Sequence, residues 1–229
     1  MPNRFLNFVA DILRREDTSE EGQYIKLILA EYRNKRPLYE EFCAAVHKLL
    51  DSLLKENHYK YQIVSRTKTP ERLREKLIRK SAAGIRYKDL SGIQDLAGIR
   101  VLFYSERDKE RFVKHLKREI NGTINLEDRR RRGGYEATHV VMALDPKRLE
   151  LSEYKRFAKL ECEIQITSLL RHAWAEIEHD FIYKDIMGLK GTDPKKFALM
   201  EQQLGKILDT HIKKASQEFE EVMKIVDEK

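Results

Sequence analysis

The sequence predicts an α+β protein in which a mixed sheet is flanked by helices. Helical spacing of apolar residues fills both ends of the chain, whereas short apolar segments rich in β-branched residues lie in the middle. This order of elements favours one compact domain. We expect an N-terminal helical region at 1–58, a core at 59–186 and a C-terminal helix at 187–229.

Composition excludes several classes of protein. The 229 residues are 41% hydrophobic, enough to bury one substantial core, but no apolar run reaches the roughly 18 to 20 residues of a membrane span. Cys43 and Cys162 lie in apolar patterns typical of buried free thiols in a reducing compartment. We therefore expect a cytoplasmic protein without a membrane partner, whose net charge of +7 suits polyanions such as nucleotides or RNA.

Prolines mark the expected helix starts, because the missing N–H costs nothing in the first turn. Three of them stand just ahead of helical patterns: Pro37, Pro70 and Pro194. Thr69 and Asp193 are candidate N-caps for the last two. The pattern predicts one helix ending near Arg33, a second from Pro37 to about residue 57, a third over 70–80 and a long one from 194 to the end.

Four segments are expected to form strands. Residues 61–66, 98–104 and 138–144 are apolar and β-rich, and an amphipathic helix is expected at about 106–120. In 158–167 apolar and polar residues alternate, which is typical of a half-buried strand. Its polar face carries Glu161, Glu163, Gln165 and Thr167.

Basic side chains gather where the first strand meets the next helix. Arg66 and Lys68 share a face at the strand end, and Arg72, Lys76 and Arg79 share one side of the helix by their spacing. A polyphosphate needs such an arrangement, because the helix dipole and the side-chain charges add. The alternative is a solvated basic face, and this stretch alone leaves both interpretations open.

Asp95 stands in a turn between Gly92 and Gly98, immediately before an apolar strand that contains Arg100. An aspartate at a strand entrance can hold Mg²⁺, which takes one or two protein carboxylates and leaves its other positions to phosphates and water. The planar guanidinium of Arg100 can stack on a base. The alternative makes Asp95 a turn cap and Arg100 a surface charge.

A run of arginines precedes a Gly-Gly hinge and then Tyr135 and His139. The run consists of Arg129, Arg130, Arg131 and Arg132. An exposed tyrosine followed by a strand histidine offers stacking and hydrogen bonding to a nucleotide. Runs of this kind are usually solvated or form an interaction patch, but beside an aromatic they can also contact a nucleic-acid backbone.

The helix expected at about 168–185 permits two interpretations. His172, Glu176 and His179 share a face, which could make a metal-binding helix. Nothing nearby suggests the hydrolytic or redox chemistry of such a site. We favour a site that begins at Glu163, into which His172 alone points from this helix. Packing of the helix on the sheet is expected from Ala173, Trp174 and Ile177.

Four segments in order, "SRTKTPERLREKL", "GIQDLAGIRV", "GYEATH" and "EIQITSLLRHAWAEIEHDFIYK", carry a resemblance. Together they resemble the synthetase domain of the RelA/SpoT alarmone synthetases, in particular the small stand-alone members, over roughly residues 60–186. The resemblance implies a nucleotidyltransferase-like α+β fold and a pyrophosphokinase. In that reaction the 3′-hydroxyl of GDP or GTP attacks the β-phosphorus of ATP, giving (p)ppGpp and AMP, and Mg²⁺ is required.

On the donor side, the resemblance implies that Arg66 and Arg100 hold the adenine of ATP between them. Its phosphates would be bound by Lys68, Lys76 and Arg79, and Arg72 would add a further cation beside them. Asp95 would bind Mg²⁺.

On the acceptor side, Tyr135 would stack on the base and His139 would lie near the phosphates. Glu163 would activate the 3′-hydroxyl and help to hold the metal, with Gln165 beside it. Many members have Asn or Asp at the position of His172, where it reads the guanine edge, so the identity of the acceptor base stays open. The sequence lacks the His-Asp hydrolase motifs of long members, and we expect synthesis without hydrolysis.

A second hypothesis keeps the chemistry and changes the acceptor. Related toxic small members transfer pyrophosphate from ATP to the 3′-CCA end of tRNA, and an antitoxin protein neutralises them. The arginine run, the cations Arg33, Lys35 and Arg36, and His172 in place of a guanine reader motivate this hypothesis. A third, a nucleotide sensor without catalysis, is weaker because Asp95 and Glu163 are both present.

The last helix carries an apolar stripe that bears on the oligomeric state. It consists of Leu199, Leu204, Ile207, Leu208, Ile212, Phe219, Val222 and Ile225. Such a stripe is more typical of packing within the chain than of an interface. Small members of the family commonly form tetramers, so the terminal helices remain candidates for contacts in a homo-oligomer.

Overall fold

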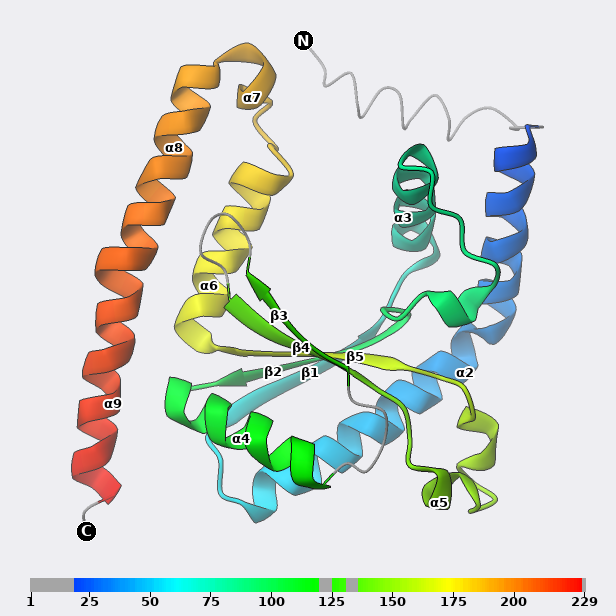
Figure 1. Cartoon of the computed structure of the whole chain (residues 1–229), viewed down its shortest axis with the longest axis horizontal. Helices are drawn as coiled ribbons and strands as arrows, with labels where there is room; N and C mark the ends of the chain where they lie inside the picture. Colours follow the sequence, from blue (N-terminus) through cyan, green and yellow to red (C-terminus); the bar gives the residue numbers. More distant parts are fainter. Residues whose placement is uncertain (1–18, 120–124, 131–135, 228–229) are drawn as a thin grey trace.

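The structure is a computed structural model that describes residues 19–119, 125–130 and 136–227 (Figure 1). The long helix α2 (Glu20–Glu56) is followed by β1 (Tyr61–Thr67), α3 (Pro70–Ala82), β2 (Ala97–Phe103) and α4 (Glu106–Glu119). Then come β3 (Asn125–Arg130), β4 (Glu136–Met142), the short helix α5 (Pro146–Leu149), β5 (Cys162–Ser168) and α6 (Leu169–Glu178). The chain ends with α7 (Leu189–Thr192), α8 (Pro194–Ile207) and α9 (Lys213–Asp227).

Five strands of the described residues form one sheet in the order β1-β2-β5-β4-β3. β2 and β5 are parallel, and the other neighbours are antiparallel. The sheet is therefore mixed and flanked by helices, as the sequence predicts. The parallel pair places Gly98 opposite Glu163 and Arg100 opposite Gln165, so that polar residues from two distant segments lie side by side.

One face of the sheet forms the hydrophobic core. Ile99 and Val101 of β2 and Ile164 and Ile166 of β5 are buried, as alternation along a strand requires. In Figure 1, α4 and the C-terminal part of α2 lie below the sheet, whereas α3 and α6 rise on its other side and the N-terminal part of α2 runs up beside α3. The polar residues of β2 and β5 therefore face the space between α3 and α6.

The N-terminal helical region differs from the prediction at Pro37. This proline lies inside α2 instead of starting a helix, so the expected break between Arg33 and Pro37 is wrong. Proline supplies no N–H to the carbonyl four residues earlier, and α2 changes direction along its length (Figure 1). The helix continues because Tyr32, Tyr39 and Phe42, on both sides of the proline, are buried in the core. Thr69 and Asp193 do cap α3 and α8, accepting hydrogen bonds from the backbone N–H groups of Arg72 and Lys196.

The polar segment Asn125–Arg130 has no strand pattern in the sequence, yet it forms the edge strand β3. Backbone pairing with β4 defines this strand, with Glu127 opposite His139. An edge strand can be held by backbone hydrogen bonds to its neighbour, so it can form without an alternation of apolar residues. Among the described helices, none combines the length and the apolar character needed to cross a membrane.

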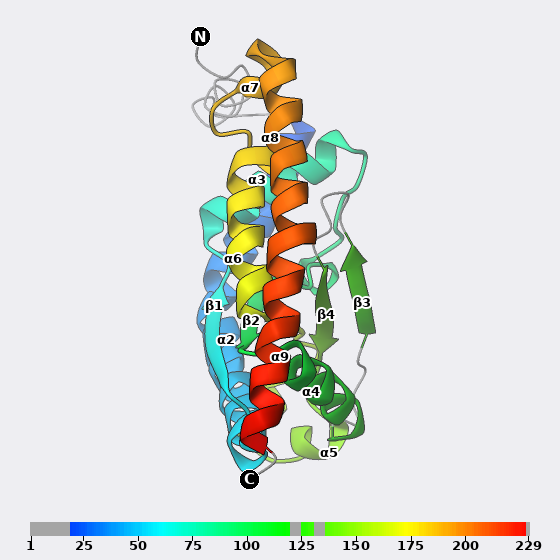
Figure 2. The same cartoon turned by 90° about the vertical axis from the view of Figure 1, so that its left-hand side faces the viewer.

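The C-terminal helices form one rod, because a π-helical turn at Leu208–Ile212 joins α8 to α9. Figure 2 shows the rod running alongside α6 toward α4. The indole Nε1 of Trp174 donates a hydrogen bond to the carbonyl of Leu204 at 2.9 Å. Trp174 therefore packs α6 against the rod. Ala173 and Ile177 are exposed, so the expectation that all three residues pack α6 on the sheet is wrong.

The apolar stripe of the rod is only partly covered within the chain. Leu208 is buried, but Leu199, Phe219, Val222 and Ile225 are between 50% and 67% exposed. Because α6 and α4 contact one side of the rod, packing among the described residues does not cover most of the stripe, whereas the sequence favours packing within the chain.

Candidate active site

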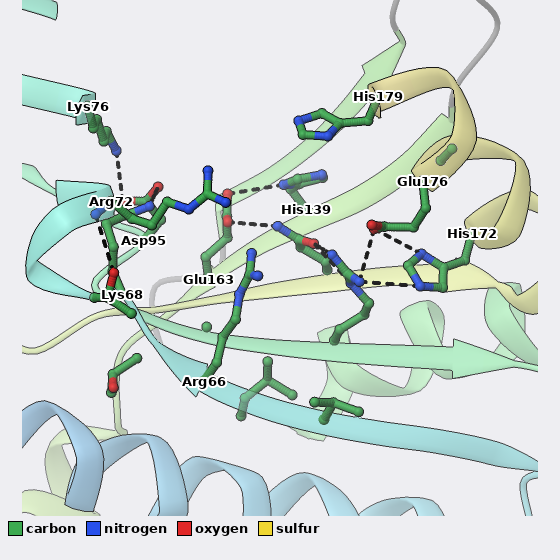
Figure 3. Close-up of a pocket in the computed structure, with 18 of the residues that line it drawn as sticks. Arg66, Lys68, Arg72, Lys76, Asp95, His139, Glu163, His172, Glu176 and His179 are labelled. Atoms are coloured by element: carbon green, nitrogen blue, oxygen red, sulfur yellow. Dashed lines mark hydrogen bonds and ion pairs between the residues drawn. The ribbon is translucent and has the colours of Figure 1, made fainter. Parts of the chain in front are cut away.

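A pocket with a volume of about 680 Å³ opens on the polar face of the sheet, between α3 and α6 (Figure 3). Its lining comes from β1, β2, β4 and β5 and from both helices. It brings together most residues that the sequence singled out, namely Arg66, Lys68, Arg72, Lys76, Arg79, Asp95, Arg100, His139, Glu163, Gln165 and His172. Segments far apart in the chain therefore meet at one site.

The carboxylate of Asp95 lies between two lysines. Its Oδ2 is 3.0 Å from Nζ of Lys68, and its Oδ1 is 2.7 Å from Nζ of Lys76. Burial raises the pKa of Asp95, but the charges of Lys68 and Lys76 outweigh burial and hold that pKa below its usual value. The hydroxyl of Tyr32 donates to the carbonyl of Lys68 and fixes the loop from α2. This end of the pocket is therefore a rigid cluster of charges beside the N-terminus of α3.

Glu163 has a hydrogen-bonding partner at each carboxylate oxygen. Nδ1 of His139 lies 3.1 Å from Oε1, and Nε2 of Gln165 donates to Oε2 at 3.0 Å. Burial raises the pKa of Glu163, but His139 and Gln165 outweigh burial, and the pKa lies below its usual value. The site thus holds an ionised carboxylate in a fixed orientation, as a general base or a metal ligand requires.

Arg100 connects the sheet to α6. Its NH1 is 3.1 Å from Oε1 of Glu176 and 3.3 Å from Nε2 of His172, and its Nε donates to Gln165 at 3.4 Å. Since the guanidinium can only donate, Nε2 of His172 accepts and its ring proton lies on Nδ1. Burial lowers the pKa of His172 and Arg100 lowers it further, against the opposing effect of Glu176. His172 is therefore neutral near pH 7.

Comparison with known protein families identifies the family of this chain. A sequence model of the family described as "Region found in RelA / SpoT proteins" matches residues 65–187, more than half of the 229 residues and all of the pocket residues named from the sequence. The chain belongs to the RelA/SpoT family. No curated protein matched this RelA/SpoT chain in sequence.

The fold of this RelA/SpoT protein resembles solved small alarmone synthetases. Small alarmone synthetase 1 from Bacillus subtilis is 21% identical, with a TM-score of 0.66 over 87% of this chain and 99% of that one. The same protein bound to its product pppGpp is 20% identical, with a TM-score of 0.65 over 86% of this chain and 99% of that one. Its AMPCPP-bound form is 19% identical, with a TM-score of 0.59 over 87% of this chain and 100% of that one. A GTP pyrophosphokinase family protein from Streptococcus pneumoniae is 24% identical, with a TM-score of 0.64 over 86% of this chain and 95% of that one. These likenesses establish the shared fold.

The pocket of this RelA/SpoT protein takes in more of α6 than the sequence indicated. The expectation that His172 alone points into the site from this helix is wrong, because Ala175, Glu176, Glu178, His179 and Lys184 also line the pocket. At 3.6 residues per turn, positions 172, 175, 176 and 179 share a face. The same spacing that suggested a metal-binding helix could therefore have identified these residues as pocket residues.

The transition-metal interpretation of that face finds no support. Within the part of the chain that the structure describes, no three His, Cys, Asp or Glu side chains are grouped to hold a metal ion. Oε1 of Glu176 faces Arg100, and Nδ1 of His179 lies 3.6 Å from Asp180.

Asp95 and Glu163 fit a magnesium ion by the chemistry of their donors. Both offer hard carboxylate oxygens to one pocket, and magnesium needs only one or two of these when phosphates and water complete its shell. Besides burial, the negative charge of Asp95 also raises the pKa of Glu163, so the two carboxylates repel each other. A cation shared between them would relieve this repulsion.

The remaining predicted residues lie around β3. Arg129 and Arg130 end this edge strand. Arg131, Arg132 and Tyr135 lie outside the described residues. Their suggested contacts with RNA and with the acceptor base therefore stay predictions.

Proposed function

We propose that this RelA/SpoT protein transfers pyrophosphate from ATP to the 3′-hydroxyl of GDP or GTP, forming (p)ppGpp and AMP. The observation that carries the proposal is the convergence of two carboxylates, Asp95 and Glu163, with the α3 cations in one pocket. Phosphoryl-type transfer depends on positioning and charge neutralisation more than on covalent participation. The nucleotide-bound forms of the Bacillus subtilis synthetase, which shares the fold, support the choice of substrates.

The polyphosphate of ATP suits the α3 end of the pocket. There the positive end of the helix dipole adds to the charges of Lys68, Lys76 and Arg79. When ATP enters, Lys68 and Lys76 would release the carboxylate of Asp95 and bind phosphate oxygens instead. Arg66 and Arg100 flank the floor of the pocket and provide planar groups for the adenine.

Glu163 suits the role of the base in this reaction. It is ionised, both of its oxygens are held, and it can accept the proton of the acceptor 3′-hydroxyl. The hydroxyl oxygen then bonds to the β-phosphorus, and the bond from that phosphorus to the oxygen shared with the α-phosphorus breaks. AMP leaves with the shared oxygen. Asp95 and Glu163 would hold Mg²⁺, and the bound ion would neutralise part of the phosphate charge.

The test is a stoichiometric product analysis of ATP and GDP with purified protein and Mg²⁺. Equal amounts of AMP and ppGpp are expected. Glu163→Gln keeps the size of the side chain but cannot take the proton, and a loss of about 100-fold or more in kcat is expected. Glu161→Gln, just before β5 and outside the pocket, is the matched control and should retain activity. Unchanged turnover in Glu163→Gln would remove this assignment.

We also propose synthesis without hydrolysis, on the absence of His-Asp hydrolase motifs from the sequence. Incubation of the protein with ppGpp and Mg²⁺ or Mn²⁺ should release no GDP and pyrophosphate. Release at a rate that scales with enzyme concentration would contradict this.

Transfer to the 3′ end of tRNA is the alternative that the arginine run motivates. It predicts tRNA binding whose affinity falls steeply as salt increases, because binding to phosphates releases counterions. Simultaneous replacement of the run from Arg129 to Arg132 by alanine should then weaken binding and flatten the salt dependence. Filter binding without any salt-dependent retention of tRNA would exclude this alternative and the partner antitoxin that it implies.

A further inference from the structure

The two cysteines of the chain meet in the hydrophobic core. Cys43 lies on α2 and Cys162 is the first residue of β5, and both are free thiols that are 3% and 0% exposed. Their side chains hydrogen-bond each other. Because the sequence contains only these two cysteines, the contact brings together all the thiols of the protein from distant parts of the chain.

This cysteine pair lies beneath the floor of the pocket. Sγ of Cys43 is 3.4 Å from the carbonyl oxygen of Gly98 and 3.8 Å from that of Arg66. Cys162 immediately precedes Glu163, and its Sγ is 3.9 Å from the carbonyl oxygen of Glu163. Arg66, Gly98 and Glu163 all line the pocket. A change at the two sulfurs therefore acts on the backbone of three pocket residues.

The hydrogen bond makes the two thiols unequal. With Cys162 as the donor, it holds the pKa of Cys43 below its usual value. The same hydrogen bond, together with burial, raises the pKa of Cys162. Since the thiolate is the form that reacts with oxidants, Cys43 is the thiol that is oxidised first, and Cys162 is the thiol that reacts with its oxidised form.

Cys43 is buried but lies close to the edge of the sheet. Its side chain also hydrogen-bonds Ser65 of β1, which is an exposed residue of an edge strand. A small oxidant such as hydrogen peroxide can reach Sγ of Cys43 by a local opening at Ser65, without unfolding of the core. Cys162, on the inner strand β5, lies deeper than Cys43.

We propose that Cys43 and Cys162 form a redox-sensitive site, in which a peroxide converts the two thiols into a disulfide that lowers the activity of the pocket. The Cys43 thiolate attacks one oxygen of hydrogen peroxide, the O–O bond breaks, and the hydroxide that leaves is protonated to water. The sulfur of Cys162 then attacks the sulfenic acid on Cys43. The S–S bond forms, the S–O bond breaks, and a second water leaves with the proton of Cys162. Two electrons pass from the sulfurs to the peroxide, and a dithiol returns them.

The disulfide displaces residues of the pocket. A covalent bond between two sulfurs is shorter than a hydrogen-bonded contact between two thiols, so α2 and β5 must approach each other when it forms. A close-packed core transmits such a displacement, and Glu163 is the neighbour of Cys162. This effect on activity rests on the proposed function. Since a misplacement of about 1 Å can cost about 100-fold in rate, we expect kcat to fall about ten-fold or more.

Mass spectrometry and thiol titration test the site in the purified full chain. After treatment of the folded protein with hydrogen peroxide, titration in denaturant should find no thiols in place of two. The mass of the chain should be lower by two hydrogens, and proteolysis should release one peptide pair that joins Cys43 to Cys162. Pyrophosphate transfer, measured on the same samples, should fall with disulfide formation and recover with dithiothreitol.

Two single variants are the matched controls. Cys43→Ala should keep its activity under reducing conditions and lose none of it with the same peroxide treatment. In Cys162→Ala the oxidation should stop at the sulfenic acid of Cys43, which dimedone labels, whereas dimedone should leave Cys162 of Cys43→Ala unlabelled. Thermal melts establish that both variants are folded, and the measurements on the natural sequence decide the proposal if either is not.

The outcomes separate this inference from the proposed function. Two free thiols after peroxide treatment, a disulfide that joins two copies of the chain, or full activity of the disulfide form would overturn the inference. If the reduced protein transfers no pyrophosphate, the proposed function fails, and the mass measurement together with calorimetric binding of AMPCPP decides the inference. The disulfide form should then bind AMPCPP more weakly than the reduced form, and equal affinities would overturn the inference.

Discussion

Nδ1 of His139 lies 3.1 Å from Oε1 of Glu163. The two residues are diagonal neighbours on β4 and β5, since His139 pairs with Gln165, two residues beyond Glu163. The family resemblance assigns His139 to the phosphates of the acceptor. The contact adds a role as a positioning residue that orients the carboxylate of Glu163.

Replacement of His139 should alter the pH dependence of the reaction. The pKa of Glu163 is lowered in the folded protein, with His139 as the largest influence that opposes burial. His139→Ala should therefore raise this pKa, so that activity is lost at a higher pH as the pH falls. A loss of about 10- to 100-fold in kcat at neutral pH is also expected. The measurement is the pH profile of kcat/KM.

His139→Gln serves as the conservative variant, because its amide N–H can still donate to Glu163. It should recover part of the activity and shift the acid limb back toward that of the natural sequence. If the acid limb of His139→Ala does not move, His139 does not act through Glu163.

Lys76→Met should weaken ATP binding more than acceptor binding. Lys76 is 2.7 Å from Oδ1 of Asp95 and lies beside the proposed phosphate site. Its loss removes a cation and raises the pKa of Asp95, so the KM for ATP should increase about ten-fold or more. Steady-state kinetics with each substrate varied separately measures both KM values. Lys114→Met, exposed on α4 and remote from the pocket, is the control. Equal changes in both KM values would contradict the assignment.

Glu106→Gln should destabilise the protein in a pH-dependent way. The Glu106 carboxylate joins α4 to α6 through Arg171 at 2.9 Å and through Ser168, and it also contacts Lys109 at 2.5 Å. Burial raises the pKa of Glu106, but Lys109, Ser168 and Arg171 outweigh it, and the pKa lies below 4.5. The ion pairs therefore contribute stability above the pKa of the unfolded chain, and this contribution is lost as pH falls through the folded pKa.

Urea unfolding measures this effect. Near pH 7, Glu106→Gln should lower the free energy of unfolding by about 1–3 kcal/mol. The difference should begin to narrow as the pH falls below 4.5, where glutamate in the unfolded chain becomes protonated, and should continue to narrow until the pH passes below the lowered pKa of Glu106 in the folded protein. Glu110→Gln, exposed on the same helix, should have little effect. A difference that is constant from pH 7 to pH 4 would contradict the account.

The exposed stripe on α9 predicts self-association. Phe219, Val222 and Ile225 are at least half exposed and share one side of the helix. We propose that they contact another copy of the chain. Light scattering should give a mass above that of the monomer, and the double substitution of Phe219 and Val222 by Glu should reduce it. Lys214→Glu, 72% exposed on the same helix, is the control. A monomeric natural protein at micromolar concentration would contradict this proposal.

Most of the fold could be predicted from the sequence because the core strands have regular apolar patterns. β1, β2 and β5 and the helices α3 and α4 lie within a few residues of their predicted bounds. The predicted helix break before Pro37 is wrong because the burial of residues on both sides of this proline stabilises a helix that continues through it. β3 was not predictable from pattern, since the sequence Asn125–Arg130 lacks the apolar alternation that marks the other strands.

The candidate site was predictable in its residues and less so in its contacts. The order of the motifs identified the charged residues of β1, α3, β2 and β5 that line the pocket. The sequence could not show that Lys68 and Lys76 pair with Asp95, because these partners lie on different elements. Nor did it reveal the place of Glu176, which depends on how α6 turns over the sheet.

Following the label from ATP shows whether this protein transfers pyrophosphate to a guanine nucleotide. ATP labelled at the β and γ phosphates is incubated with the protein and Mg²⁺, and GDP, GTP and deacylated tRNA are offered separately. Label is expected in ppGpp and pppGpp, with release of unlabelled AMP. Label that moves only to tRNA, or to none of the three acceptors, would contradict it.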